Sequence, residues 1–346
     1  MSFSYRFPAV RGKQAGREYY ITMIPLGLLS RLFPNEEDVV QPEFRAQRKI
    51  NETRIPEIKK YILKNRDNYV FSALSASIDG KFTFISDDSN NVGIIDIDMN
   101  STFLINDGQH RKAAIEAAIE EDKTLADETI SIVLFKDDGL IRSQQMFTDL
   151  NKHAVKTSNS LSTLYDSRDE IAMATKDVID SSDFFIKYTD KERDILGKNS
   201  SKLFTLNTIY KANLRILHKN TCDKKDLIFL KDFWNELYNN IVEWNELMNK
   251  QITKKDLKEN YILTLAITIQ AFGKVGNYFY EHRNYDMHSY LKKLKSISWE
   301  RNNKNWIGNT IRENGKVMNS EEAINLTYKK IMDLLNIDIE SCKYDK

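Results

Sequence analysis

The chain has 346 residues, with 51 basic and 50 acidic side chains and a formal net charge of +1. A nearly neutral protein does not coat DNA by bulk charge, so any contact with nucleic acid must come from local clusters of cations. The sequence contains no run of the roughly 18 apolar residues that a membrane helix needs, and no signal-peptide pattern at its start. We therefore expect a cytoplasmic protein without a membrane contact, and the length predicts two domains.

The first half of the chain alternates strand and helix patterns. Strand patterns occupy residues 18–24, 69–78, 81–84, 94–99, 102–105 and 128–135. Helix patterns occupy residues 54–65, the segment after Arg111, and residues 140–151. Thr53 is the expected N-cap of the first helix, and Asp79-Gly80 predicts a tight turn between two strands. The alternation predicts a mixed α/β layer.

The second half changes character. Helix patterns dominate from Leu161 onward, at residues 166–179, 205–218, 227–250 and 261–280, and a last helix begins after its N-cap Ser320. We therefore predict an α+β protein, with a mixed α/β N-terminal domain at residues 1–157 and an all-helical C-terminal domain at residues 158–346. The short polar stretch Ser158-Asn159-Ser160 marks the expected boundary.

The most informative stretch is the turn Asp107-Gly108-Gln109-His110-Arg111, which joins a strand pattern to a helix pattern. A helix N-terminus favours an anion, and glycine lets a ligand approach the backbone. Arg111 can bind a phosphate through two parallel hydrogen bonds, and His110 can accept or donate a proton near neutral pH. An equally simple interpretation stays open: Asp107 caps the helix and Arg111 makes a structural ion pair.

A second constellation, Asn151-Lys152-His153, ends the helix pattern at residues 140–151. Lysine and histidine at a helix C-terminus are ordinary partners of the helix dipole. Alternatively, this segment and the Asp107–Arg111 turn both follow strand–helix connections of one sheet and converge on one pocket. The phosphate- or nucleotide-binding set would then be Gly108, Gln109, Arg111, Asn151, Lys152 and His153. Asp107, His110 and His153 are a weak candidate metal set, because two histidines and one acid lack periodic spacing, so we assign no metal ligand from the sequence.

Two groups of cations are candidates for DNA contact. The first comprises Arg45, Arg48, Lys49 and Arg54, and the second comprises Lys292, Lys293, Lys295, Arg301 and Lys304. The segment from Glu281 to Lys316 contains eight basic and four acidic residues, which gives it a net charge of +4. Trp299 and Trp306 flank part of the second group. Such aromatic rings stack on bases or hold a loop against the core, and we favour the second role.

The pentapeptide at 107–111 resembles the signature of the DGQHR-domain proteins, and the chain resembles the DndB family of DNA sulfur modification proteins. Further stretches resemble that family in the expected order, at residues 44–48, 54–58, 69–74, 144–154 and 201–206. A more distant resemblance is to the ParB and sulfiredoxin-type fold, in which a Gly-x-x-Arg turn between a strand and a helix binds nucleotide phosphates.

The resemblance implies a ParB-like N-terminal domain and a regulatory role in DNA phosphorothioation. The chain would bind the promoter region of its own operon and repress transcription of the modification genes. It also implies ATP or CTP with Mg²⁺ as a candidate ligand, and a homo-oligomer or other sulfur-modification proteins as candidate partners. The alternative is an enzyme, a nucleotide hydrolase or DNA-nicking protein, with Asp107, His110 and Arg111 as catalytic residues.

The cysteine content bears on these alternatives. Cys222 and Cys342 are the only cysteines and lie far apart, which excludes a disulfide framework and a cysteine-based metal site. An enzyme that transfers sulfur needs thiolates or an iron–sulfur centre. The composition thus favours a regulator over the sulfur chemistry itself.

Overall fold

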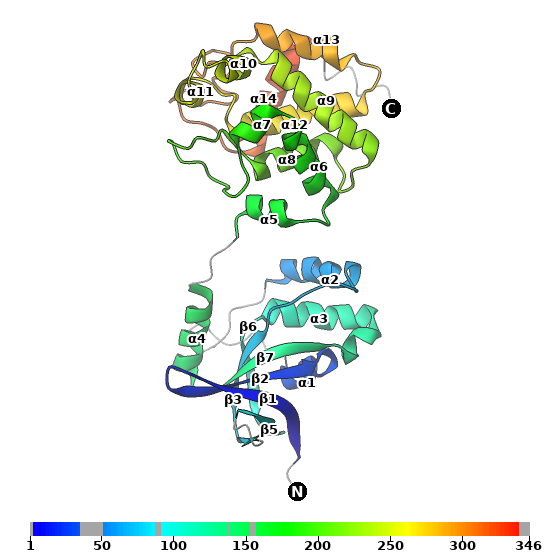
Figure 1. Cartoon of the computed structure of the whole chain (residues 1–346), viewed down its shortest axis with the longest axis vertical. Helices are drawn as coiled ribbons and strands as arrows, with labels where there is room; N and C mark the ends of the chain where they lie inside the picture. Colours follow the sequence, from blue (N-terminus) through cyan, green and yellow to red (C-terminus); the bar gives the residue numbers. More distant parts are fainter. Residues whose placement is uncertain (1–2, 35–50, 87–90, 138, 153–156, 339–346) are drawn as a thin grey trace. The chain divides into compact units, whose positions relative to one another are not determined.

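The computed structural model describes residues 3–34, 51–86, 91–137, 139–152 and 157–338. The chain divides into two compact units, residues 1–155 and 156–346 (Figure 1). Unit 1 carries the sheet and unit 2 is almost entirely helical. This composition of elements is the α+β class that the sequence predicts. No helix in the described part of the chain is long and apolar enough to cross a bilayer.

Unit 1 is built on one mixed sheet with the strand order β4-β5-β1-β2-β7-β3-β6. All neighbouring strands are antiparallel except β3 and β7, which are parallel. The strands are β1 (Ser4–Gln14), β2 (Arg17–Pro25), β3 (Leu74–Asp79), β4 (Phe82–Ser86), β5 (Val92–Asp98), β6 (Thr102–Asp107) and β7 (Thr129–Lys136).

The predicted turn at Asp79-Gly80 joins β3 and β4, but these strands do not pair with each other. Instead, β3 pairs with β6 and β4 pairs with β5, so residues 74–86 and 92–107 form one two-stranded ribbon that bends in the middle. One half of the ribbon lies beside β7 and the other half beside β1. Tyr20 of β2 packs against Phe84 of β4, with ring centroids 5.3 Å apart. Because two strands separate β2 from β4, this contact shows that the sheet is strongly curled.

Helices cover the two faces of this sheet unequally (Figure 1). The main core lies on the face where Ile78, Ile105 and Ile132 pack against α1 (Leu29–Leu32), α2 (Ile55–Lys64) and α3 (Gln109–Glu121). On the other face, α4 (Leu140–Lys152) contacts β6 through Met146, whose sulfur accepts a bond from Asn106. Short 3₁₀ turns, η1 (Leu26–Leu28), η3 (Glu52–Arg54) and η4 (Lys123–Asp127), connect these elements.

Unit 2 contains ten α-helices within its described residues and a two-residue parallel strand pair, β8 (Thr189–Asp190) with β9 (Phe204–Thr205). The helices are α5 (Asn159–Tyr165), α6 (Glu170–Asp180), α7 (Asp183–Tyr188), α8 (Leu206–Leu217), α9 (Lys224–Asn240), α10 (Val242–Met248), α11 (Lys254–Asn260), α12 (Ala266–Glu281), α13 (Met287–Leu291) and α14 (Glu321–Leu334). A 3₁₀ segment, η5 (Lys292–Ser296), follows α13.

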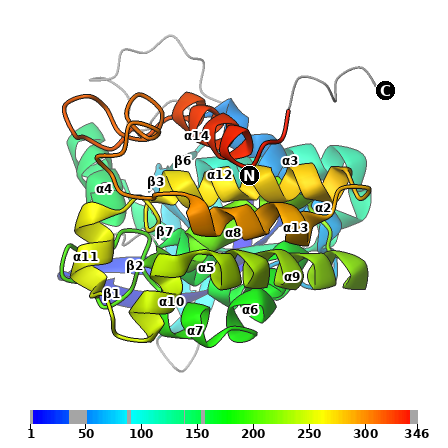
Figure 2. The ribbon, with the colours of Figure 1, turned by 90° about the horizontal axis from the view of Figure 1, so that it is seen from above.

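Helix α12 lies in the middle of unit 2 and packs against α8 and α14 (Figure 2). Two glycines allow the close approach to α8. A Cβ at Gly273 would lie 2.8 Å from the carbonyl oxygen of Ala212, and one at Gly276 would lie 2.8 Å from Ile216. The surrounding core is aromatic, and its fully buried rings include Trp234 and Trp244.

Several local expectations need correction. Thr53 does not cap α2. Asn51 accepts from the Thr53 N–H instead, and thereby begins η3 ahead of the helix. The pattern at 227–250 is two helices, because the chain leaves helical geometry at Ile241 and the Asn245 side chain donates to the Ile241 and Tyr238 carbonyls.

Strand β1 was absent from the sequence-based expectation. Pro8 lies inside it, and proline normally argues against an interior strand because it has no N–H to donate. The strand nevertheless pairs on both sides, with β5 and β2. Buried and exposed side chains alternate along β1, and the burial of Phe7 and Ala9 in the core accounts for its place in the sheet.

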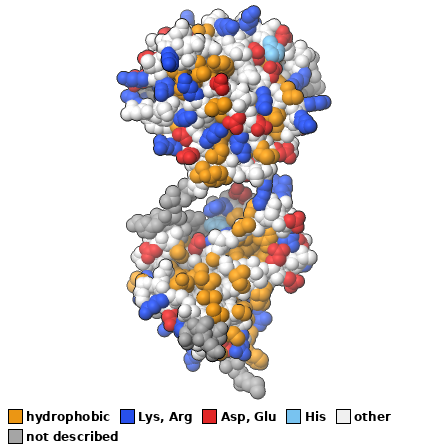
Figure 3. Space-filling view, viewed as in Figure 1, with side chains coloured by type: hydrophobic (Ala, Val, Ile, Leu, Met, Phe, Trp, Pro, Cys, Tyr) orange, Lys and Arg blue, Asp and Glu red, His pale blue; other side chains and the backbone are white. Residues whose placement is uncertain are grey.

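The outer face of the sheet in unit 1 carries a patch of aliphatic side chains, and hydrophobic residues gather over this unit in Figure 3. Val10 lies opposite both Ile21 and Val92, and Ile85 lies opposite Ile94, so the patch crosses four neighbouring strands. Its exposed members are Val10, Ile21, Met23, Ile85, Val92 and Ile94.

Candidate functional site

The strand-to-helix turn predicted at residues 107–111 is present. Strand β6 ends at Asp107, Gly108 is the N-cap residue, and α3 begins at Gln109. Gly108 has φ +107°, a left-handed conformation that favours glycine. A Cβ there would also lie 2.3 Å from Leu74 Cδ2 and 3.2 Å from Arg111 Nη2. Glycine is thus needed for both the backbone conformation and the packing against β3.

Arg111 is the most extensively bonded side chain of the turn. Its Nη2 donates to Asp107 Oδ2 at 2.6 Å. Its Nη1 donates to Ser72, at 2.6 Å to both the carbonyl oxygen and Oγ, and to the Ala73 carbonyl at 3.0 Å. The arginine side chain is only 17% exposed. It therefore ties the first turn of α3 to the segment that leads into β3.

The structural interpretation of this turn had two parts, an ion pair of Arg111 and a helix cap by Asp107, and only the first is present. Arg111 does form an ion pair, but Asp107 does not cap the helix, because the N-cap is Gly108 and no side chain accepts there. The binding of a phosphate by Arg111 stays a prediction. A phosphate at this turn has to compete with four protein acceptors for the two Nη atoms.

His110 connects the turn to the start of the α2 region. Its Nε2 accepts from the backbone N–H of Asn51 at 3.0 Å. His110 and Arg111 therefore fasten α3 to two different chain segments, before α2 and before β3.

A buried ion pair follows directly after the pentapeptide and was missed from the sequence. Lys112 Nζ lies 2.9 Å from Glu116 Oε2, and the lysine side chain is 5% exposed. The spacing i, i+4 is the only signal in the sequence, and it is also typical of exposed helix pairs. In the structure α3 packs against α2, a contact between distant segments that this spacing does not predict.

The second constellation is described only in part. Asn151 and Lys152 end α4, but their side chains and His153 lie outside the described residues. Helix α4 contacts the same strand that carries the turn, because Asn106 immediately precedes Asp107 and its Nδ2 bonds Met146 of α4 at 3.2 Å. Convergence of the two segments on one pocket stays a prediction.

The first cationic group falls mostly outside the described residues, which omit Arg45, Arg48 and Lys49. Arg54 is described and exposed, at the end of η3. In the second group, Lys292, Lys295 and Lys304 are exposed. Lys293 donates to the Leu335 carbonyl at 2.8 Å, and its Nζ lies 4.7 Å from the centroid of the Tyr290 ring.

Arg301 and the tryptophans of this region are part of the packing. Arg301 donates to the carbonyls of Tyr261 at 3.1 Å and Lys258 at 2.6 Å. Trp299 and Trp306 are fully buried and stack on each other with centroids 5.0 Å apart. The expectation that these rings hold the loop against the helical core is confirmed.

One group of side chains with metal-ligand chemistry occurs among the described residues, and the sequence reasoning missed it. Asp232 and Glu236 of α9 and His288 of α13 bring ligand atoms within 4.8 Å of one another. His288 Nδ1 lies 3.1 Å from Glu236 and Nε2 lies 3.4 Å from Asp232. Each ring nitrogen already faces a carboxylate, so protonated His288 is ion-paired with both acids, and its pKa is raised chiefly by the hydrogen bond to Glu236.

Comparison with known proteins identifies the family of the chain. No curated protein and no solved structure matches the chain. A family model described as DNA-sulfur modification-associated matches residues 7–338, which is nearly the whole chain and includes both units. The chain therefore belongs to the DndB family.

Proposed function

We propose that this protein is a DNA-binding regulator of a DNA phosphorothioation system and represses transcription of the modification operon. Its family is associated with DNA sulfur modification, which supports a role in that system. DNA binding is a more specific claim than a role in this system, and it is supported by the placement of the cations at 292–304.

The observation that carries the proposal is a group of exposed lysines that have no carboxylate partner among the described residues. In a 3₁₀ segment, residues three apart lie on the same side. Leu291 and Leu294 are buried, whereas Lys292 and Lys295 are exposed. Among the described residues, no carboxylate forms a salt bridge with Lys292, Lys295 or the exposed Lys304. Phosphates of DNA are suitable partners for such charges.

The described cysteine also supports a regulator over a sulfur-transfer enzyme. Burial, and then the nearby Asp226 and Asp223 carboxylates, raise the pKa of Cys222 to about 11. At neutral pH this side chain is a thiol, whereas the nucleophile in sulfur chemistry is a thiolate.

The proposal is tested by gel-shift titration of the duplex that lies upstream of its own operon. The variant Lys292→Glu/Lys295→Glu is compared with Lys224→Glu/Lys225→Glu, because both pairs are exposed and both changes lower the net charge equally. We expect the first variant to bind at least tenfold more weakly and the second to bind like wild type. The proposal fails if wild-type protein does not bind the duplex, or if the two variants lose affinity equally.

A further inference from the structure

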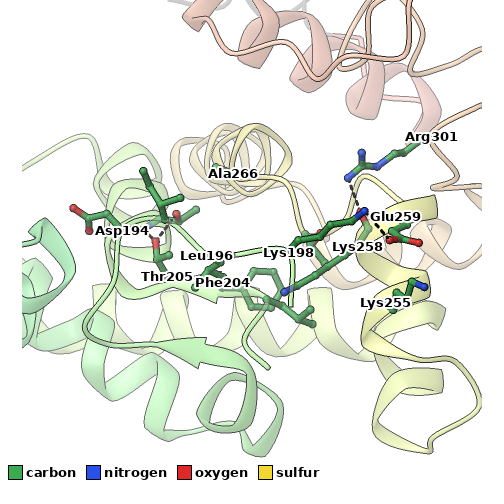
Figure 4. Close-up of a pocket in the computed structure, with 15 residues that line it drawn as sticks. Asp194, Leu196, Lys198, Phe204, Thr205, Lys255, Lys258, Glu259, Ala266 and Arg301 are labelled. Atoms are coloured by element: carbon green, nitrogen blue, oxygen red, sulfur yellow. Dashed lines mark hydrogen bonds and ion pairs between the residues drawn. The ribbon is translucent and has the colours of Figure 1, made fainter. Parts of the chain in front are cut away.

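Unit 2 contains a cavity of about 780 Å³ that has no counterpart in the sequence-based expectations. Its wall is made by the loop 194–198, by residues 203–208 around the start of α8, by α11, by the start of α12 and by Arg301 (Figure 4). Ligand pockets for small molecules usually measure about 300–1,000 Å³. The cavity thus has the size of a nucleotide site.

Four cations line the cavity, and they gather at one end of it. Figure 4 shows Lys198, Lys255, Lys258 and Arg301 together at that end, with Glu259, whereas Asp194 lies at the opposite end. Glu259 lies 3.5 Å from Lys198 Nζ. The cationic end therefore holds four positive charges and one negative charge.

The acid at the opposite end is already satisfied within the protein. Asp194 accepts from the backbone N–H groups of Asn159 at 2.7 Å and Ser160 at 2.8 Å. It also accepts from both side chains, at 2.9 and 2.8 Å. These bonds anchor the start of α5, and they hold the carboxylate at the end of the cavity away from the lysines (Figure 4).

The two more buried cations bond only backbone oxygens among the described residues. Lys258 Nζ donates to the Ser200 carbonyl at 2.8 Å, and Arg301 donates to the Tyr261 and Lys258 carbonyls. Burial lowers the pKa of both residues, with Lys254 adding to the effect on Lys258 and Glu259 opposing it at Arg301. A cation that loses water without gaining a carboxylate is stabilised by a bound anion.

The start of α12 adds backbone N–H donors to the wall of the cavity. Ala266, its first residue, lines the cavity, and the N-cap residue Leu265 provides no side-chain acceptor. The first N–H groups of a helix favour a negatively charged group. By contrast, α8 begins at the cavity with its own cap, because Thr205 Oγ1 accepts from the Thr208 N–H.

Apolar side chains complete the wall between the two ends. Leu196, Leu203 and Phe204 line the cavity beside the charged groups. From this arrangement we propose that unit 2 binds a phosphorylated small molecule of nucleotide size, with its phosphates at the cationic end and its less polar part against these apolar side chains. This site lies within unit 2, whereas the turn at 107–111 belongs to unit 1, and the proposal extends the function beyond DNA regulation.

The test is calorimetric titration of the full chain with ATP, CTP and inorganic phosphate. We expect at least one nucleotide to bind, and inorganic phosphate to bind at least tenfold more weakly because it cannot contact the apolar wall. Lys255→Glu and, separately, Lys198→Glu should weaken nucleotide binding about tenfold or more. Lys329→Glu, an exposed lysine outside the cavity, is the matched control and should leave the affinity unchanged.

Three outcomes overturn the proposal. One is that neither nucleotide binds. Another is nucleotide binding that Arg111→Ala abolishes and the cavity variants leave intact, which would place the ligand at the turn in unit 1. The third is a Lys255→Glu protein that loses duplex DNA but keeps its nucleotide affinity, which would assign the cavity to DNA phosphates. DNA binding is measured without nucleotide, so failure here leaves the regulator proposal standing.

Discussion

Arg111 Nη2 donates to Asp107 Oδ2 at 2.6 Å across one turn of chain, while Nη1 donates to Ser72 and Ala73. One guanidinium thus joins β6, α3 and the segment before β3. The contact explains why an acid and an arginine flank the turn four residues apart. It also makes Arg111 a residue whose removal affects the folded state as well as any ligand.

We expect Arg111→Ala to lower the free energy of unfolding by about 2–4 kcal/mol, because several charge-assisted bonds are lost and Asp107 loses its partner. Arg111→Lys should lose less of the free energy of unfolding than Arg111→Ala but not match wild type, since an ammonium cannot reproduce the planar set of donors of a guanidinium. Urea unfolding measures both, and Arg54→Ala, at an exposed arginine, should stay within about 0.5 kcal/mol of wild type. Unchanged stability together with weaker ATP or CTP binding in Mg²⁺ would instead assign Arg111 to a ligand.

Gly108 offers a comparison with Gly139 that separates backbone strain from steric conflict. Both have positive φ, +107° and +101°, but a Cβ at Gly139 meets nothing within 4 Å, whereas one at Gly108 would overlap Leu74. Gly139→Ala should therefore cost about 1 kcal/mol and Gly108→Ala about 2–4 kcal/mol. Thermal unfolding of both variants checks the difference, and equal losses would show that Leu74 moves aside without cost.

Operator affinity should fall steeply with salt even though the net charge is +1. Each neutralised phosphate contributes a slope of about 0.9 in log affinity against log salt concentration. The Lys292→Glu/Lys295→Glu protein should show a slope smaller by about 2 than wild type. Fluorescence anisotropy over a salt series measures the slope. Parallel lines for the two proteins would place the DNA contact elsewhere, with Arg54 and the neighbouring cations as the next candidates.

Glu243 predicts a pH dependence of stability. Burial raises the pKa of this carboxyl to about 7, and Glu246 and Glu300 contribute in the same direction. Because its pKa is higher in the folded than in the unfolded state, the folded protein favours the protonated carboxyl. The free energy of unfolding is therefore highest at low pH and decreases as the pH rises from about 4.5 to about 7. Glu243→Gln should therefore stabilise the protein at pH 8 by about 1–3 kcal/mol and change it little at pH 5. The same gain at both values would contradict this assignment.

Local signals were enough to predict the elements that depend on nearby residues. The strand–glycine–helix turn at 107–111, the cap at Ser320 and the helical character of the second half all appear as expected. Strand alternation, helix spacing and capping act over a few residues, so the sequence alone carries them. The family model likewise matches the linear sequence, over residues 7–338.

Contacts between distant segments decided the rest. The Asp79-Gly80 turn looks like a hairpin locally, yet β3 pairs with β6 and β7 because burial on the curled sheet outweighs the nearest partner. Apart from Asp107, the acceptors of Arg111 lie nearly forty residues away, at 39 and 38 positions for Ser72 and Ala73. The cavity in unit 2 brings residue 194 to residue 301. Such pairings depend on packing free energy summed over the whole unit, which no local pattern of residues encodes.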